Sequence, residues 1–380
     1  MLLHKLSLII ISLGLLNVGI GGSAHAASCL PAAPNTPAQY ENVLKQPIDG
    51  TWYRGDSGQS VVLPNGKTLY VFGDTIMGPA SATWANGAIH NSAILVTGGC
   101  ATALTGPRDA NGKATDWMKV PAALDVPNVS DYYWASTPYM DGSTLRMFLL
   151  HEYNDANGFH AIGSDIATFS LTTGTPVLKS IKATPSSRAT AGPVWGAAVV
   201  RDASYTYIYG SRYKGEFLTF GHHYYVARVA NNSDETVLSN WRYWNGASWS
   251  TNQTSAAEII SGVNGPGTDG TAFSIGGTYM LISKANDMLG SSLNYWTAPT
   301  PAGPWQAGTA PLISPIPNVN AAGGELTYLG LAHPGQPLAS GKLLVSWSLN
   351  SSDAAFFGNP RYGVYFSEVD IPTASRARTK

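Results

Sequence analysis

The sequence predicts an all-β protein, a five-bladed β-propeller built as a single domain behind a cleaved signal peptide. Three observations predict this fold. Strand–turn–strand units recur about every 70 residues, turn residues are abundant, and almost no stretch has the apolar spacing of a helix. The 41 glycines and 24 prolines among 380 residues exceed the average share of about 12% and fit a chain with many turns.

Five hairpins are predicted, each around a turn rich in Gly, Asp or Asn. They cover residues 59–72, 135–150, 197–210, 271–283 and 329–347, with turns at 64–66, 141–142, 202–204, 276–277 and near 341–342. Further candidate strands follow at 88–96, 160–171, 224–229 with 240–244, 292–297 and 362–369. Four strands per unit, repeated around a ring, form a propeller. A β-sandwich or a β-helix is the alternative, although a β-helix would have a shorter repeat.

The two ends of the chain are predicted to lie outside the propeller. His4 and Lys5 precede an apolar run and then small residues ending in Ala24-His25-Ala26, which is typical of a secretory signal peptide over residues 1–27. The propeller is expected over residues 28–371 and a disordered basic tail over 372–380. Because no later apolar run reaches the ~18 residues of a membrane span, we expect a secreted or periplasmic protein without a membrane span.

The two cysteines, Cys29 and Cys100, are expected to form one disulfide in an oxidising compartment. This bond would tie the N-terminus to the first blade. The alternative for Cys29 is a lipid anchor. The residue three positions earlier is Ala26, where a lipoprotein signal would have Leu, Val or Ile, so the sequence favours the disulfide.

The charge balance narrows the classes of partner. Charged residues make up 12% of the chain and the net charge is −1, whereas nucleic-acid-binding proteins show a basic patch or stripe. We therefore expect no nucleic-acid partner. With 11 Trp, 19 Tyr and 10 Phe beside so little charge, an uncharged ligand that stacks on rings, such as a polysaccharide, is favoured. The oligomeric state is left open.

Two acids flank the strands predicted for the first hairpin. Asp56 stands in Gly-Asp-Ser-Gly before the first strand, and Asp74 stands in Phe-Gly-Asp-Thr after the second. In an antiparallel hairpin these two positions lie at the same end, so the acids are predicted neighbours. Two carboxylates about 5 to 9.5 Å apart are what glycoside hydrolysis requires. The alternative is that both aspartates cap turns.

The leading residues of the first strand in each unit are expected to converge on the mouth of the ring. The predicted substrate-binding residues are Arg54, Asn91, Asp131, Trp134, Trp195, Arg212, Asp269 and Glu325. Tyr132 and Tyr328 stand beside them. For the acids the alternative is a turn or strand-edge role, and for the tryptophans it is the core. No H-E-x-x-H motif or Cys/His cluster occurs, so no catalytic metal or other cofactor is expected, while a structural Ca²⁺ is left open.

The first unit resembles the opening of five-bladed propeller glycoside hydrolases. More narrowly, it resembles a secreted bacterial family, long described as a domain of unknown function, that includes endo-D-arabinanases acting on mycobacterial arabinan. Residues 194–200 (VWGAAVV), 207–210 and 241–246 agree with this in character. The resemblance implies that Asp56 and Asp74 are the catalytic pair. The family's first acid often stands in Thr-Asp-Leu-Gly, whereas this chain has Gly-Asp-Ser-Gly, so the sugar stays open.

The sequence and the resemblance together lead us to expect a secreted glycoside hydrolase with a paired-aspartate mechanism. Its expected substrate is a furanoside polysaccharide such as arabinan, with mycobacterial D-arabinan as one candidate and endo-cleavage as the expected mode. Two alternatives stay open at this stage. One is a propeller that binds glycan without cleaving it, and the other is an exo-acting arabinofuranosidase or xylosidase. Which aspartate is the acid and which is the base is also open.

Overall fold

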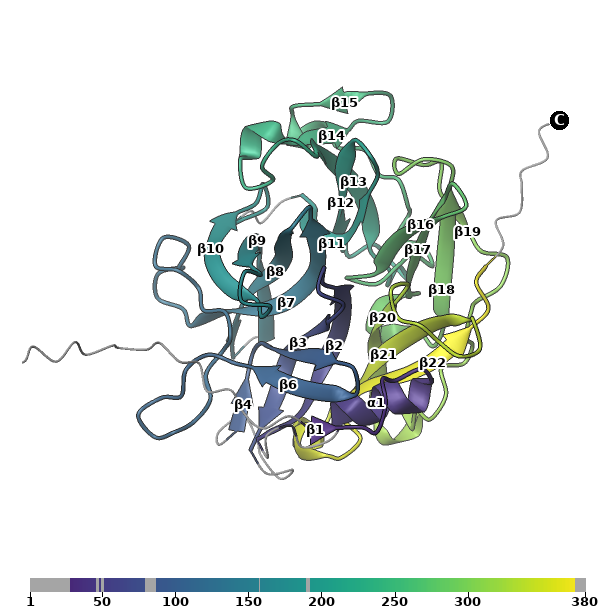
Figure 1. Ribbon diagram of the computed structural model, residues 1–380. Coiled ribbons are helices and arrows are strands. Elements are labelled where there is room, and N and C mark those ends of the chain that lie inside the picture. Colours follow the sequence, from purple (N-terminus) through teal and green to yellow (C-terminus); the bar gives the residue numbers. More distant parts are fainter. Residues whose placement is uncertain are drawn as a thin grey trace, which may run out of the picture.

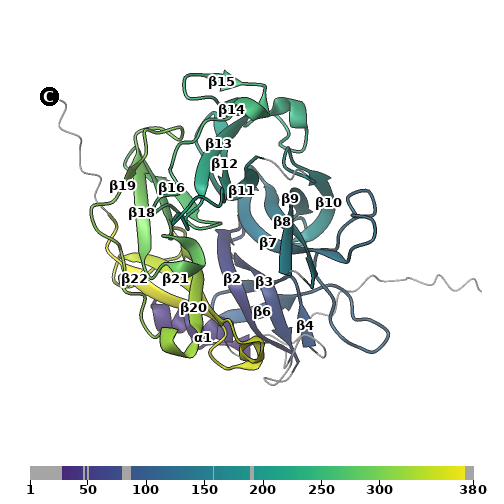
Figure 2. The ribbon, with the colours of Figure 1, turned by 180° about the vertical axis from the view of Figure 1, so that it is seen from behind.

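Five antiparallel sheets stand around a central axis as the blades of a propeller (Figure 1), and the view from behind shows the same ring (Figure 2). This computed structural model describes residues 28–45, 48, 51–78, 87–156, 158–188 and 192–372. The predicted all-β, five-bladed fold is confirmed. The predicted signal peptide, and the predicted tail beyond residue 372, lie outside the described residues.

The blades are numbered I to V in chain order. Blade I contains β1 (Ser28–Cys29), β2 (Trp52–Val62), β3 (Thr68–Met77), β4 (Ala88–Ile89), β5 (Ser92–Thr97) and β6 (Cys100–Leu104). Blade II contains β7 (Asp131–Asp141), β8 (Thr144–Asp155), β9 (Gly158–Ser170) and β10 (Val177–Ala183). Blade III contains β11 (Val194–Arg201), β12 (Tyr205–Arg212), β13 (His223–Ala230), β14 (Arg242–Trp244) and β15 (Trp249–Ser250).

The last two blades are smaller. Blade IV contains β16 (Thr271–Ile275), β17 (Thr278–Lys284), β18 (Leu293–Ala298) and β19 (Gln306–Ala307), and blade V contains β20 (Glu325–Ala332), β21 (Leu343–Ser351) and β22 (Gly363–Val369). Short 3-10 helices lie at Leu238–Asn240, Gln253–Ser255, Asp287–Leu289, Ala321–Gly323 and Ala354–Gly358. Within the described ranges, no helix is both long and apolar enough to cross a membrane.

The first strand of each hairpin lies at one end of the strand order in its sheet, and this end faces the axis (Figure 1). These inner strands are β2, β7, β11, β16 and β20. Along the ring β2 contacts β7, β7 contacts β11, and β11 contacts β16. The expectation that the first strands line the axis is therefore correct.

Four of the inner strands leave regular pairing partway along their length. The register shifts within residues 55–59 of β2, 135–138 of β7, 195–198 of β11 and 328–331 of β20. A β-bulge of this kind bends the strand and changes the direction of a side chain. In β11 the bulge contains Gly196, whose φ is 110° and whose added Cβ would lie 2.3 Å from the Phe148 ring. Only glycine fits there.

The first hairpin is longer than predicted. Its strands, expected over residues 59–63 and 68–72, run over Trp52–Val62 and Thr68–Met77. Asp56 and Asp74 consequently lie inside the strands, where they were expected just beyond them. The bulges absorb the unmatched residues, so the pairing continues past both acids.

One α-helix among the described residues, α1 (Pro37–Lys45), was missed by the sequence analysis. Thr36 precedes the helix and Pro37 occupies its first turn, which is a common way for a helix to start. Tyr40, Val43 and Leu44 are buried on one face, with the spacing of an amphipathic helix. The helix has nine residues and many of them are polar, so the apolar spacing was too short to recognise in the sequence.

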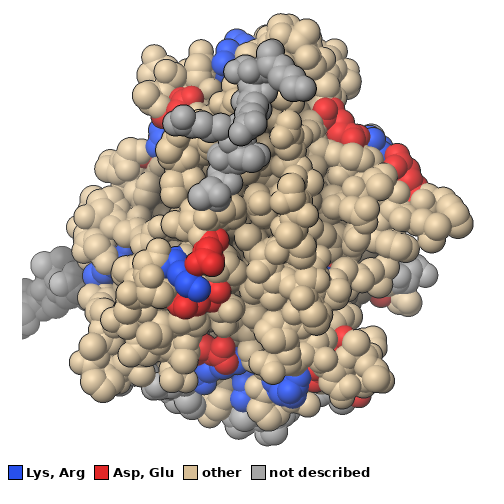
Figure 3. Space-filling model, turned by 90° about the vertical axis from the view of Figure 1, so that its right-hand side faces the viewer, with Lys and Arg blue, Asp and Glu red and all other residues tan. Residues whose placement is uncertain are grey.

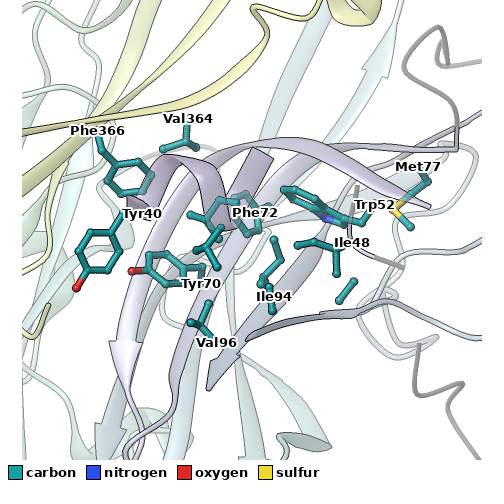
Figure 4. Close-up of a cluster of buried hydrophobic side chains, with 14 of the residues drawn as sticks. Tyr40, Ile48, Trp52, Tyr70, Phe72, Met77, Ile94, Val96, Val364 and Phe366 are labelled. Atoms are coloured by element: carbon teal, nitrogen blue, oxygen red, sulfur yellow. The ribbon is translucent and has the colours of Figure 1, made fainter. Parts of the chain in front are cut away.

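Helix α1 closes the ring between blades V and I (Figure 1). Its buried face shares one core with side chains of both blades, as Figure 4 shows. These include Trp52, Tyr70, Phe72, Ile94 and Val96 of blade I and Leu344, Val364 and Phe366 of blade V. The helix thus joins the first and last blades by burying apolar surface from each.

Blade V has three strands in the described part of the chain, and not the four that were predicted. Helix α1 lies beside its outermost strand, β22. Glu41 Oε2 accepts a hydrogen bond from the backbone N–H of Phe366 at 3.4 Å, and the ammonium of Lys45 lies 3.5 Å above the ring of Tyr365. The helix therefore covers an edge that a fourth strand would otherwise pair with.

The predicted disulfide is present and joins Cys29 of β1 to Cys100 of β6. It fastens the segment before α1 to the outer edge of blade I. The N-terminal segment is thereby held to blade I on one side of the helix, while the helix itself packs on blade V.

We predict that Leu44→Ala lowers the free energy of unfolding by about 2–5 kcal/mol, because it leaves a cavity in the core that joins blades V and I. Asn42→Ala, on the exposed side of the same helix, is the matched control and should change it by less than about 0.5 kcal/mol. Denaturant unfolding followed by tryptophan fluorescence measures both. Equal effects of the two variants would contradict a closing role for α1.

Candidate functional site

Asp56 and Asp74 meet at the bulge between β2 and β3. Gly55 pairs with Thr75 and Ser57 pairs with Phe72, so the single residue Asp56 faces both Gly73 and Asp74. The two carboxyl groups are close enough for the charge of Asp56 to raise the pKa of Asp74. The structure therefore brings together the two acids that the sequence analysis proposed as neighbours. Their catalytic role stays a prediction.

The local sequence explains why the Asp56 carboxyl can lie against β3. Ser57 and Gly58 both have left-handed φ angles, 73° and 71°, and this conformation is costly for a non-glycine residue such as Ser57. Ser348 of blade V stabilises it by accepting a hydrogen bond from the Ser57 N–H at 2.8 Å. A Cβ at position 73 would lie 2.6 Å from Asp56 Oδ1, so Gly73 is required for the carboxyl to fit.

Asp56 is the more deeply buried acid, with 8% of its surface exposed. The Tyr328 hydroxyl donates a hydrogen bond to its Oδ2 at 2.7 Å. Burial raises the pKa of Asp56 to about 6, although bonds from the Tyr328 and Tyr362 hydroxyls act in the opposite direction. The Tyr362 hydroxyl also donates to the backbone oxygen of Asp74 at 2.8 Å. Two tyrosines of blade V thus hold the acids of blade I.

Asp74 is half-buried and binds a ring of blade II. The indole Nε1 of Trp134 donates a hydrogen bond to Asp74 Oδ1 at 2.6 Å. Burial and then the charge of Asp56 raise the pKa of Asp74 well above its usual range, while the bond from Trp134 opposes this shift. Two buried carboxyls this close titrate as a pair, so near neutral pH the pair holds a proton.

Aromatic rings border Asp74 on the side of blade II. The ring centroid of Trp134 lies 5.7 Å from that of Tyr132 and 5.2 Å from that of Phe159. Tyr132 in turn stacks on His90, with centroids 3.8 Å apart. Phe159 is 63% exposed, so this ring series runs from the acid pair out to solvent. Such rings suit a ligand with apolar faces and polar edges.

A third acid, Asp269, lies just before β16 and joins three blades. Its Oδ2 accepts hydrogen bonds from Ser136 of β7 at 2.9 Å and from Gln59 of β2 at 3.3 Å. Burial raises the pKa of Asp269 to about 7, and the nearby charge of Asp287 acts in the same direction. Asp269 therefore binds the inner strands β2 and β7, which carry Asp56 and Trp134.

Several residues of this region were missed by the sequence analysis, namely Gln59, Ser136, Glu152 and Tyr362. Glu152 is 3% exposed and lies directly opposite Tyr132 in the β7–β8 register, so the two side chains share a face of the sheet. Burial raises the pKa of Glu152 to about 8. The available signal was an acid close behind an apolar run, since Leu149 and Leu150 stand just before His151 and Glu152.

Two predicted substrate-binding residues are corrected by the structure, because they are sealed in the protein. Asn91 is 0% exposed. Its side-chain nitrogen donates hydrogen bonds to the backbone oxygens of Met118 and Tyr133, and its side-chain oxygen accepts one from the Met118 N–H. Trp195 is 1% exposed and packs against Trp241 in the core of blades II and III. The bulge that follows Trp195 turns its ring away from the axis.

Two predicted acids have partners that occupy their carboxylates. His151 Nε2 lies 2.7 Å from Asp131 Oδ2, which also accepts the N–H of Val126 at 2.9 Å. Glu325 binds Arg361 through both oxygens at 2.7 Å. Although desolvation acts in the opposite direction, these bonds hold the pKa of Glu325 below its usual value. Neither acid contacts the Asp56–Asp74 pair.

The two predicted arginines lie at the periphery of this region. The Arg54 guanidinium donates to the backbone oxygen of Asn359 at 3.0 Å, in the loop before Tyr362. Arg212 is exposed at the end of β12. Of the predicted site residues, the structure thus gathers Asp56, Asp74, Trp134 and Asp269, with Arg54 beside them.

Over the ranges that the structure describes, no group of three or more His, Cys, Asp and Glu side chains is arranged to hold a metal ion. The expectation that catalysis needs no cofactor is not tested by this observation and stays a prediction.

Comparisons with known proteins place the fold. A family model described as "Domain of unknown function (DUF5005)" matches residues 38–369. A "putative hydrolase" from Bacteroides ovatus superposes with a TM-score of 0.66 at 19% identity, covering 90% of this chain and 93% of that one. An alpha-L-arabinofuranosidase from Lactobacillus brevis gives a TM-score of 0.46 at 9% identity, covering 83% and 90%. No curated protein sequence matches the chain. At 19% identity, the similarity to the Bacteroides ovatus structure supports the fold alone.

We predict that Asp56→Asn stabilises the fold near neutral pH. The pKa of Asp56 is raised from 3.8 to about 6 by burial, so both the folded and the unfolded chain are protonated below about pH 4. Between about pH 4 and pH 6 the unfolded chain ionises while the folded one keeps its proton, so the free energy of unfolding falls until the folded carboxyl ionises as well. The amide removes this loss, so the variant should gain about 1–3 kcal/mol at pH 7 and little at pH 4.

Denaturant unfolding at the two pH values tests this expectation. Asp370→Asn, at a side chain that is 88% exposed, is the control and should show no such pH-dependent gain. A gain for Asp56→Asn that is equal at pH 4 and pH 7 would show that the Asp56 carboxyl is not held protonated in the fold.

Proposed function

The chain belongs to the DUF5005 family, and we propose that it is a secreted glycoside hydrolase whose catalytic pair is Asp56 and Asp74. The observation that carries the proposal is the pair itself. Two carboxyls face each other across a bulge, and burial raises the pKa of both. A pair that holds one proton near neutral pH contains both a general acid and a base or nucleophile.

The proposed reaction uses both members of the pair. The protonated carboxyl gives its proton to the glycosidic oxygen as the bond from that oxygen to the anomeric carbon breaks. The ionised carboxyl either takes a proton from the attacking water or bonds to the anomeric carbon itself, in which case water releases the sugar in a second step. In both routes one water is consumed, its hydroxyl ending on the anomeric carbon and its proton restoring the pair.

The surroundings of Asp74 support a sugar as the ligand. Trp134 binds the acid through its indole N–H and continues into the ring series of Tyr132 and Phe159. Aromatic faces beside a small number of directed polar groups are typical of pockets that bind uncharged ligands. The resemblance of the first and third units to arabinan-degrading propellers supports a furanoside polymer, such as arabinan or mycobacterial D-arabinan, with endo-cleavage as the proposed mode.

Export is part of the proposal. The signal-like residues 1–27 and the disulfide between Cys29 and Cys100 both fit a protein that works outside the cytoplasm. A polymeric substrate fits as well, because polysaccharides such as arabinan are found outside the cell membrane.

The test of function is a product profile. Purified protein is incubated with arabinan, xylan and mycobacterial cell-wall arabinan, and the products are separated by size. A ladder of oligosaccharides supports endo-cleavage, whereas single sugars alone would indicate the exo-acting alternative. Binding without any released sugar would favour the propeller that only binds glycan.

We predict that Asp56→Asn and Asp74→Asn each lower the rate of hydrolysis by at least about 10²-fold, because an amide can neither donate the acid proton nor act as the base. The substitutions keep the size of the side chain and an oxygen that can accept the bonds from Tyr328 and Trp134. Release of reducing sugar from the polymer measures the loss. Asp370→Asn is the control and should retain wild-type activity, while wild-type rates in either catalytic variant would exclude the pair.

We predict a bell-shaped pH profile of kcat/KM. With the pKa of Asp56 raised to about 6 by burial and that of Asp74 raised further, activity falls on the acid side as both carboxyls become protonated. It falls on the alkaline side as both become ionised. Because the Trp134 N–H lowers the pKa of Asp74, Trp134→Phe should move the alkaline limb to higher pH. An unmoved limb would show that it does not belong to Asp74.

A further inference from the structure

A hollow of about 660 Å³ lies between the outer strands of blade III and the loop that follows β18 in blade IV. It does not border the Asp56–Asp74 pair. Aromatic and small residues form most of its lining: Tyr207, Trp244, Gly246, Trp249, Ile259, Thr300, Pro301, Ala302, Gly303, Pro304 and Trp305, together with Glu258. A second aromatic surface is thus present, apart from the candidate active site.

The rings of this hollow are held in fixed positions. The centroids of Trp244 and Trp249 lie 5.4 Å apart, and Trp249 is 6.0 Å from Tyr207. Arg228 lies over the ring of Trp249 at 4.3 Å, and the indole Nε1 of Trp305 donates to the Pro301 oxygen at 3.2 Å. Rings that are already ordered lose little entropy when a ligand stacks on them.

The polar groups of the hollow suit an uncharged ligand. Its only charged lining residue is Glu258, whose carboxylate is paired with Lys214 at 2.8 Å and with His223 at 2.7 Å. Among the described residues, nothing accepts a hydrogen bond from Nε1 of Trp244 or of Trp249. Two indole N–H groups without a protein acceptor thus belong to the lining, and the cation beside them, Arg228, lies over one face of the Trp249 ring.

The wider surface also suits an uncharged ligand. Figure 3 shows the right-hand side of the molecule as drawn in Figure 1, where uncharged residues cover most of the face and Lys, Arg, Asp and Glu lie in a few small groups of mixed sign. The whole chain carries a net charge of −1. An anionic polymer or a charged peptide would find little to pair with on such a surface.

We propose that this hollow is a second glycan-binding site, which holds a neutral oligosaccharide segment of a polysaccharide away from the acid pair. The sugar's apolar C–H faces would stack on Trp244, Trp249 and Tyr207, and its hydroxyls would accept from the two indole N–H groups. The ligand class rests on the proposed function, because a propeller that cleaves a polymer meets long neutral chains. A second contact on the same chain raises the effective concentration of substrate at the acids.

A proline-rich peptide is the other occupant that an aromatic groove can take. Such grooves bind the rigid polyproline helix, which they recognise by its shape. The two indole donors and the paired carboxylate of Glu258 suit either ligand. The presence of a candidate sugar-cleaving site on the same domain favours the glycan, and the experiment includes the peptide as an outcome.

The experiment measures binding in a background that cannot cleave. Wild-type protein and the Asp74→Asn variant are run through gels that contain soluble arabinan or xylan, and their retardation gives the affinity. Trp244→Ala and Trp249→Ala, each in the Asp74→Asn background, should weaken the retardation roughly 3- to 10-fold. Ala302→Trp fills the hollow without removing a contact and should have the same effect, which guards against loss of folding in the tryptophan variants.

The control is Phe217→Ala, at a ring that is 90% exposed and does not line the hollow; its retardation should match that of the parent. In the otherwise wild-type protein, the hollow variants should lower kcat/KM on the polymer and leave it unchanged on a short oligosaccharide. Retardation that is unchanged in all three hollow variants would overturn the proposal, as would binding of a proline-rich peptide without glycan. If no glycan is cleaved but the hollow variants lose binding, the second site stands and the proposed hydrolase fails.

Discussion

Two buried carboxyl groups that cannot both ionise without a large cost set the requirements for the rest of the site. Asp56 and Asp74 meet in a bulge of one hairpin, where burial raises the pKa of both. The fold supplies each with a neutral donor, the Tyr328 hydroxyl and the Trp134 indole. In the described part of the chain no cation pairs with either carboxyl, so the pair keeps a proton that an ion pair would have removed. This retained proton is what makes acid and base chemistry available to the same two side chains.

The propeller provides these donors because its ring brings distant parts of the chain to one axis. Tyr328 belongs to blade V, Trp134 to blade II and Ser136, which binds Asp269, also to blade II. Bulges in the inner strands turn such side chains toward one another. The site therefore depends on the closed ring, in which blade V contacts β2 directly and helix α1 adds a core shared by blades V and I. A change far from the acids can loosen their hydrogen bonds in this way.

Local patterns in the sequence predicted the hairpins well. The turns around Gly66, Gly142 and Gly276 follow from residues that tolerate positive φ. The strands beside them follow from the way that successive side chains of a strand point to opposite faces of the sheet. The meeting of Asp56 with Asp74 is also a local consequence, since both belong to one hairpin. Predictions failed where they depended on the direction of a single side chain. Asn91 and Trp195 were placed at the mouth by their position in the chain, but both point into the core.

The sequence by itself determined the fold class, the repeated hairpins, the disulfide pairing of its only two cysteines and the closeness of the two acids, because all of these arise from short-range geometry or simple counting. Only the tertiary structure decided the strand lengths around the acids, the helix that closes the ring, and the partners Tyr328, Trp134 and Ser136. Those contacts join residues on different blades, and their formation depends on how five sheets pack around one axis. No local propensity contains that information, since the same residue can face the axis or the core according to where a bulge falls.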